Sequence, residues 1–259
     1  MTSLDRYAEI FINSAKKLLE EENLNNNPEY LEVFKNHLLA LKGPKQLARK
    51  ITPHDIFFSK LMVGFNEIYN SYSSLLDIQV YIGRFPYSKT RVSKTRYIAY
   101  HMENYFNEVY ILKERLNAYC TIIARLYKND HTLKDLTTII NSLSEYVQKS
   151  LKGITDVRGK HIHSNRLKDE NLDRLNTLEL INHGPKRIPA MKYLYASVYR
   201  DTRKKFCLSI KQNNEAIKKI LDEYFDVLYK VVTNDKRQIR YPEQKKYNPA
   251  QLFVAPLNQ

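Results

Sequence analysis

A short basic segment of the chain holds the residue types best suited to acting on phosphate esters. Within nine positions it carries three cations and two histidines, namely Arg158, Lys160, His161, His163 and Arg166. Arginine offers a permanent, fork-shaped cation to phosphate oxygens, and histidine takes up and releases protons near neutral pH. One group can deprotonate a ribose 2′-OH, an arginine can stabilise the transition state, and a protonated group can serve the leaving 5′ oxygen. The segment therefore predicts RNA cleavage without a metal.

The stretch from Val157 to His163 resembles the R-x(4–6)-H motif of the HEPN superfamily. The resemblance implies a helical bundle, a homodimer whose two motifs meet in a basic interface cleft, and cleavage that leaves a 2′,3′-cyclic phosphate. It also implies that Arg158 and His163 form the motif pair, and we assign His161 an assisting role. Many members are ribonucleases of toxin and antiphage systems, so an antitoxin or regulatory partner is expected. Gly159 stands where the family commonly has a polar residue after the arginine.

Helical geometry leaves alternatives open for this motif. Residues five apart on a straight helix are separated by about 140°, so Arg158 and His163 share a site only if the segment is irregular or two copies combine. His161 is about 60° from Arg158. A metal bound by His161 and His163 lacks an evident third ligand, so we expect no metal or other cofactor.

Two further Arg/His pairs have a comparable spacing. Arg96 and His101 lie beside a basic run over 84–96; the alternatives are that they line the same cleft or that they are themselves the motif pair. Arg125 and His131 straddle the expected end of a helix, where cations cap the helix dipole.

The charge balance also favours a nucleic-acid partner. Lys and Arg number 42 against 28 acids, which gives a formal net charge of +14. Tyrosines lie near basic runs at 84–96, 200–205 and 236–246, and such mixtures bind single-stranded RNA by stacking and phosphate contacts. The alternative is a non-catalytic helical protein that binds nucleic acid or protein through its basic faces. The residues that we expect to bind RNA are Lys160, Arg166, Arg91, Lys94, Arg96 and His101.

Apolar spacing predicts helices throughout, and only 6 glycines argue against a protein with many turns. We expect an all-α, elongated helical bundle with two long helices, at about 92–128 and 189–232. Asn213 interrupts the apolar seam of the second, where it would either fix register or face solvent. The seam of the first comprises Ile98, Met102, Tyr105, Val109, Leu112, Leu116, Tyr119, Ile123 and Leu126.

The expected organisation has three parts: an N-terminal helical element over 1–50, a HEPN-like bundle over 51–235, and a basic tail containing prolines over 236–259. No apolar run reaches 18 residues and no signal peptide is evident, so we expect a cytoplasmic protein without a membrane partner. Only 2 cysteines, Cys120 and Cys207, fit a reducing compartment.

Overall fold

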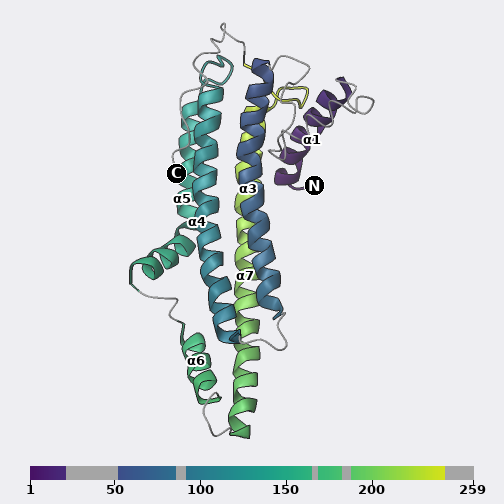
Figure 1. The fold of residues 1–259 in the computed structure, drawn as a ribbon. Helices are drawn as coiled ribbons and strands as arrows, with labels where there is room; N and C mark the ends of the chain where they lie inside the picture. Colours follow the sequence, from purple (N-terminus) through teal and green to yellow (C-terminus); the bar gives the residue numbers. More distant parts are fainter. Residues whose placement is uncertain (22–51, 86–91, 165–168, 183–187, 243–259) are drawn as a thin grey trace, which may run out of the picture. The chain divides into compact units, whose positions relative to one another are not determined.

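The computed structural model describes residues 1–21, 52–85, 92–164, 169–182 and 188–242, and describes their side chains except at 18–21 and 157–164. Within these residues the chain forms six α-helices (Figure 1). In chain order they are α1 (Ser3–Glu21), α3 (Pro53–Gly83), α4 (Lys94–Leu126), α5 (Leu136–Ser164), α6 (Glu170–Asn182) and α7 (Pro189–Val232). The prediction of an all-α fold is confirmed, and the two long helices lie where the apolar spacing places them.

Reciprocal hydrogen bonds define where two of the helices begin. The Asp55 backbone N–H donates to the Thr52 hydroxyl (3.2 Å), and the Thr52 N–H donates to the Asp55 carboxylate (2.7 Å). Thr2 and Asp5 form the same pair of bonds ahead of α1 (3.2 and 3.0 Å). Each such pair of bonds is a capping box. It satisfies two backbone donors that helical geometry leaves without partners, and it places an acid at the positive end of the helix dipole.

The apolar seams form the core. In α4 the predicted seam is buried from Ile98 to Ile123, while Leu126 is only half-buried. The seams of α5 and α7 are buried as well. They comprise Leu136, Ile140, Leu143, Val147, Ile217, Leu221, Tyr224, Leu228 and Val231. A spacing of four and three places these side chains on one stripe of each helix, so their burial follows from the sequence pattern.

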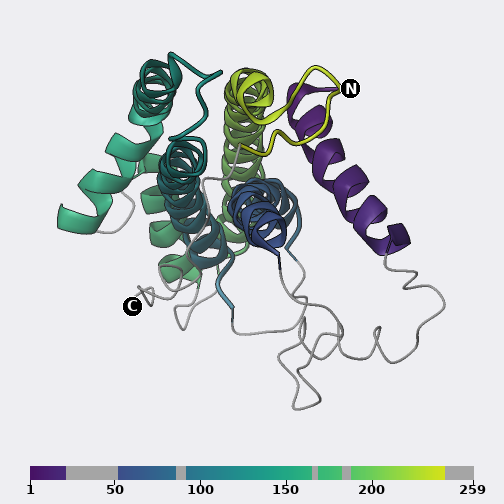
Figure 2. The ribbon, with the colours of Figure 1, turned by 90° about the horizontal axis from the view of Figure 1, so that it is seen from above.

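The described residues fall into two compact units. Unit 2 comprises Gly64–Thr121 and Ile139–Tyr224, and it is a bundle of parts of α3, α4, α5 and α7, with α6 beside them. Figure 2 shows the ribbons of α3, α4 and α7 running next to each other. At the centre of the unit the Tyr105 hydroxyl of α4 donates to Asn214 Oδ1 of α7 (2.9 Å), and Asn214 Nδ2 donates to the Leu75 carbonyl of α3 (3.3 Å).

Unit 1 comprises Met1–Val63, Ile122–Thr138 and Phe225–Gln259. Here α1 packs on the end of α7 through the Tyr7 and Phe225 rings, whose centroids are 4.7 Å apart, and on the start of α3 through Phe11 and Phe58 (6.0 Å). The expected N-terminal element and C-terminal tail therefore each contribute residues to unit 1, whereas 22–51 and 243–259 lie outside the description.

The segment between α5 and α7 differs from the sequence-based expectation. The apolar periodicity of the sequence weakens between Leu151 and Pro189, which favours a break between helices. The helix α5 nevertheless runs on to Ser164, and a further helix, α6, follows. The Asp169 carboxylate caps α6 by accepting hydrogen bonds from the N–H groups of Asn171 (2.8 Å) and Leu172 (3.3 Å). The apolar pattern does not indicate α6, because this helix is short and buries only Leu172 and Leu175.

The start of α5 also differs in detail. The spacing of Thr132 and Asp135 is that of a capping box at a helix start, but the described chain around this turn has no hydrogen bond between them. The Thr132 hydroxyl instead donates to Asp130 Oδ1 (2.6 Å) and accepts from Arg240 Nη1 (2.6 Å), and α5 begins at Leu136. A partner distant in the sequence therefore takes the hydroxyl that local spacing assigns to a cap.

Across the described residues, each helix is too short or too polar to cross a lipid bilayer.

Candidate nucleic-acid interface

The predicted motif lies in the last turns of α5. The backbone is helical at 158, 160, 161 and 163, so Gly159 does not end the helix. The ribbon of α5 changes direction before these turns (Figure 1). On a continuous helix positions 158 and 161 lie about 60° apart, and 158 and 163 about 140° apart. The side chains of Arg158, Lys160, His161 and His163, and all of Arg166 and Arg91, lie outside the described part.

Three other predicted residues, Lys94, Arg96 and His101, come from the first turns of α4 in unit 2. The Ser93 hydroxyl caps this helix, accepting from the Arg96 backbone N–H (3.1 Å), and donates to the Glu179 carboxylate of α6 (2.6 Å). The first turn of α4 holds no acid, and Lys94 and Arg96 are both exposed. Two cations therefore add to the positive end of the helix dipole, an arrangement that attracts anions.

The Tyr199 ring of α7 packs against one cation from α4 and one from α7. The ring is 8% exposed, with Lys94 Nζ 5.2 Å from its centroid and Arg203 Cζ 5.6 Å from it. A second ring, Phe85, lies 5.8 Å from Lys94 Nζ. Cation–π contacts fix the aliphatic stems of long cations while their charged ends stay near solvent.

The solvent side of α7 carries a matching stripe. Tyr193 is 78% exposed, and Arg200 and Lys204 are exposed as well. Their spacing of seven and then four places all three within about 20° of one line along the helix. On α4 the exposed Arg96 and Tyr100 have the i,i+4 spacing of helix neighbours. The name α4–α7 cationic face hereafter denotes the set Lys94, Arg96, Tyr100, Tyr193, Arg200, Arg203 and Lys204. Arg96 and Tyr100 lie about 160° and about 120° around α4 from Lys94, so the set extends over more than one side of that helix.

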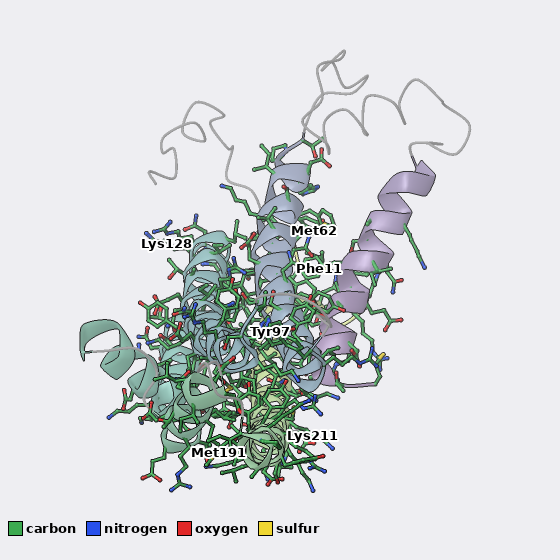
Figure 3. All side chains as sticks on the ribbon, turned by 60° about the horizontal axis from the view of Figure 1, so that its bottom comes forward. Phe11, Met62, Tyr97, Lys128, Met191 and Lys211 are labelled. Carbon is green, nitrogen blue, oxygen red and sulfur yellow. The ribbon has the colours of Figure 1, made fainter. Side chains whose placement is uncertain are left out.

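His101 sits among tyrosine rings. Its ring centroid is 4.4 Å from that of Tyr97, labelled in Figure 3, and 5.4 Å from those of Tyr81 and Tyr100. Its Nδ1 is buried and has no hydrogen-bond partner within the described structure. Burial lowers the pKa of His101 below its ordinary value, so the ring is mostly neutral at pH 7. His101 therefore offers a neutral ring to a ligand rather than a cation for phosphate.

Within the described residues, neither the cysteines nor the potential metal ligands form a second reactive site. Burial raises the pKa of the Cys120 and Cys207 thiols, which keeps both protonated at neutral pH. In the described ranges, no three His, Cys, Asp or Glu side chains group closely enough to hold a metal ion.

Sequence reasoning missed a cavity in unit 1. It has a volume of about 890 Å³ and is lined from α1, the start of α3, the end of α7 and the turn after α7. Three separate parts of the chain form the lining: α1, the start of α3, and the end of α7 with the turn that follows it. They are far apart in the sequence, so no local motif indicates the cavity. Its lining comprises Met1, Arg6, Glu9, Ile10, Asn13, Ser14, Lys17, His54, Tyr229, Asn234, Arg237, Gln238, Ile239 and Tyr241.

A scan against protein-family models, a search of curated proteins and a search of solved structures each found no match to this chain. What the chain does is therefore inferred from its own residues and their geometry.

Proposed function

We propose that the chain binds single-stranded RNA through the α4–α7 cationic face. The observation that carries the proposal is the convergence of Lys94 and Arg203 on the Tyr199 ring, beside the start of α4, whose own first turn contains no acidic residue. Packing on a buried ring orients these two cations before a ligand arrives, which lowers the entropy cost of binding.

The exposed tyrosines favour a single strand over a duplex. Tyr193 and Tyr100 are 78% and 61% exposed. Arg200 follows Tyr193 on the same side of α7, and Arg96 precedes Tyr100 on the same side of α4. Unpaired bases stack on such rings while the backbone phosphates meet the cations. In a duplex the bases are already stacked on each other and cannot reach the rings.

Binding is tested by fluorescence anisotropy with an unstructured RNA of about 20 nucleotides. The test variant replaces Arg96, Arg200 and Lys204 by Gln; all three side chains are exposed, so the fold should persist. The control replaces the exposed Lys218 and Lys219 of the same helix by Gln. We expect the test variant to lose affinity at least about tenfold and the control to lose much less. Equal losses would show diffuse charge attraction and no specific face.

We further propose that the chain cleaves the bound RNA without a metal, as its resemblance to HEPN ribonucleases implies. Arg158 would stabilise the scissile phosphate, His163 would act as the acid or base, and His161 would assist. What supports this is the composition of the segment on one continuous helix, with positions 158 and 161 close in register.

Cleavage is tested with the full chain, end-labelled RNA and EDTA. We expect products ending in a 2′,3′-cyclic phosphate, and loss of at least about a hundredfold in rate for Arg158→Ala and for His163→Ala. The matched control is Lys152→Ala, an exposed cation on the same helix. Unchanged rates in both motif variants would refute the site. RNA binding without any product would refute the cleavage proposal and leave only the binding proposal.

The register of α5 allows a sharper test of the expected homodimer. Positions 158 and 163 are about 140° apart around one helix, so two chains are expected to supply the two groups of a site. Mixing the Arg158→Ala and His163→Ala chains before assembly should then restore part of the activity, because one mixed site has both groups. No recovery in a mixture that light scattering shows to be dimeric would contradict a shared site.

A further inference from the structure

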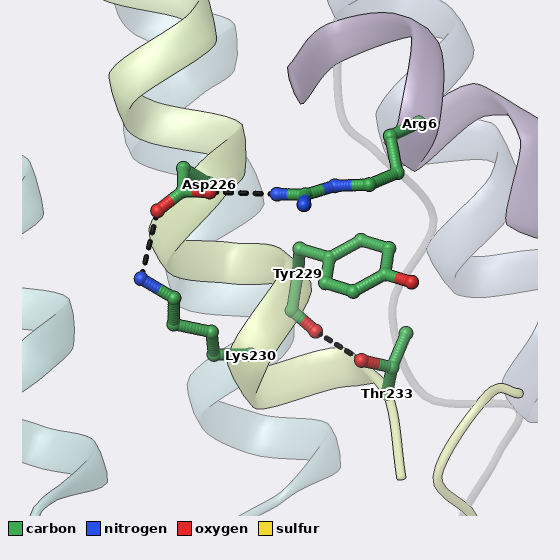
Figure 4. Close-up of polar contacts among 5 residues, drawn as sticks. All are labelled: Arg6, Asp226, Tyr229, Lys230 and Thr233. Carbon is green, nitrogen blue, oxygen red and sulfur yellow. Dashed lines mark hydrogen bonds and ion pairs between the residues drawn. The ribbon is translucent and has the colours of Figure 1, made fainter. Parts of the chain in front are cut away.

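The cavity of unit 1 is bounded by a rigid pairing of α1 with α7. Arg6 Nη2 donates to Asp226 Oδ1 (2.6 Å), and the Arg6 guanidinium carbon lies 4.3 Å from the centroid of the Tyr229 ring (Figure 4). Asp226 also accepts from Lys230 Nζ (2.7 Å). Arg6 and Tyr229 both line the cavity, so this wall is positioned by contacts that do not depend on a ligand.

A tight turn forms another part of the wall. Asn234 Oδ1 accepts from the N–H groups of Lys236 and Gln238 (both 3.0 Å), and an antiparallel bridge joins Thr233 to Ile239. At the tip of the turn Arg237 has a φ of 58°, in the left-handed region. A residue other than glycine pays about 1 kcal/mol or more for this conformation, so a surrounding network must hold it there.

The strained turn brings an unpaired cation to the cavity. Within the described structure the Arg237 side chain is exposed and forms no ion pair. The lining holds three Arg or Lys residues, Arg6, Lys17 and Arg237, against one acid, Glu9. Arg6 Nε is in addition a buried donor without a hydrogen-bond partner. Although Asp226 pairs with Arg6, basic residues outnumber acids in the lining, and Arg237 and Arg6 Nε supply donors that suit a phosphate group.

Aromatic rings line the same cavity. The His54 and Tyr241 ring centroids are 4.5 Å apart, and the Phe57 ring lies 5.3 Å from that of Tyr241. Burial raises the pKa of Tyr241, so its phenol stays neutral and can donate a hydrogen bond. A volume of about 890 Å³ lies within the range of cavities that hold small organic ligands.

We propose that this cavity binds a phosphorylated small molecule that also carries a planar ring, with the phosphate at Arg237 and Lys17 and the ring beside His54 and Tyr241. The proposal concerns unit 1 and none of its residues belongs to the RNA-binding or cleavage sites proposed above. Cations and rings in one lining would recognise the two groups of such a molecule together.

The test is calorimetric titration of the full chain with AMP, inorganic phosphate and adenosine as probes. We expect AMP to bind at least about tenfold more tightly than either phosphate or adenosine, because only AMP carries both recognised groups. Failure of AMP to bind up to about 10 mM would overturn the proposal. Equal affinity for AMP and inorganic phosphate would overturn it as well, because the rings would then contribute nothing.

The decisive variant is Arg237→Gly. Glycine adopts a positive φ without strain, so this variant should melt at the same temperature as the unmodified chain or higher, while AMP affinity falls at least about tenfold. The matched control is Lys236→Gln, which removes the same charge from the neighbouring exposed residue, outside the lining. Equal losses in the two variants would show general charge attraction and refute a built site. RNA binding should change no more in Arg237→Gly than in Lys236→Gln, which separates this test from that of the proposed function.

Discussion

At the scale of single residues, burial decides what the polar groups of unit 2 can do. His101 is surrounded by Tyr81, Tyr97 and Tyr100, and its Nδ1 has no hydrogen-bond partner within the described chain. An apolar surrounding penalises the charged imidazolium, which is why the pKa of His101 is lowered. The basic run beside it in the sequence suggests that this histidine binds phosphate, but only its surroundings in the fold show that the ring is neutral.

The lowered pKa of His101 predicts a pH dependence of stability. The unfolded chain binds a proton near the ordinary pKa of 6.5, whereas the folded chain resists it, so the unfolded state gains protons first as pH falls. This contribution to stability is complete above pH 6.5 and is lost as the pH falls through the lowered pKa. Thermal melts between pH 7.5 and pH 5 should show a smaller decline for His101→Phe than for the unmodified chain. The exposed control, His131→Gln, should keep the original decline; an unaltered decline in His101→Phe would contradict the assignment.

The buried amide of Asn214 predicts a large cost of substitution. Asn214 is 4% exposed and bonds to Tyr105, to the Leu75 carbonyl and to Gln79 Oε1 (3.0 Å). Truncation leaves these groups without partners, so Asn214→Ala should lower the free energy of unfolding by about 1–3 kcal/mol. Urea denaturation measures the effect, and Gln212→Ala, at an exposed position, should stay within about 0.5 kcal/mol. A loss as small as that of the control would show that the network does not stabilise the bundle.

At the scale of elements, local chemistry starts each helix and distant partners modify it. Thr52 with Asp55 forms the predicted cap of α3, whereas Thr132 pairs with Asp130 and Arg240. The difference lies in Arg240, which is brought to Thr132 by the turn that follows α7. Capping patterns are therefore dependable where no distant side chain competes for the hydroxyl.

The cap of α3 predicts coupled effects of its two members. Thr52→Ala and Asp55→Ala should each lower the free energy of unfolding by about 1 kcal/mol, because each removes one of the two reciprocal bonds to a backbone N–H. The double variant should lose less than the sum, since either change already breaks the box. Asp77→Ala, at an exposed position of the same helix, is the control in denaturant titrations. Strict additivity would contradict the reciprocal geometry.

At the scale of the whole molecule, the formal charge of +14 governs binding to an anionic polymer. Cations on the α4–α7 cationic face release counterions from the phosphates that they neutralise, so affinity for RNA should fall linearly on a double-logarithmic plot against salt. Each single-strand phosphate contact contributes about −0.7 to that slope. Replacing Arg96, Arg200 and Lys204 by Gln should therefore flatten the slope by about 2 in anisotropy titrations at several salt concentrations. A slope that stays the same would place the RNA elsewhere on the chain.

The sequence by itself determined the long helices, though not the short α6, because the period of apolar residues is a local property. The seam from Ile98 to Ile123 and the burial of Ile217, Leu221 and Tyr224 follow from spacing alone. Spacing also identified Arg158 and His163 as a motif, which stays a prediction. Only the tertiary structure placed Lys94 and Arg203 on one buried ring and gathered Arg6, His54 and Arg237 around a cavity. Such sites combine residues distant in the sequence, and their neighbourhood depends on which helix faces pack together.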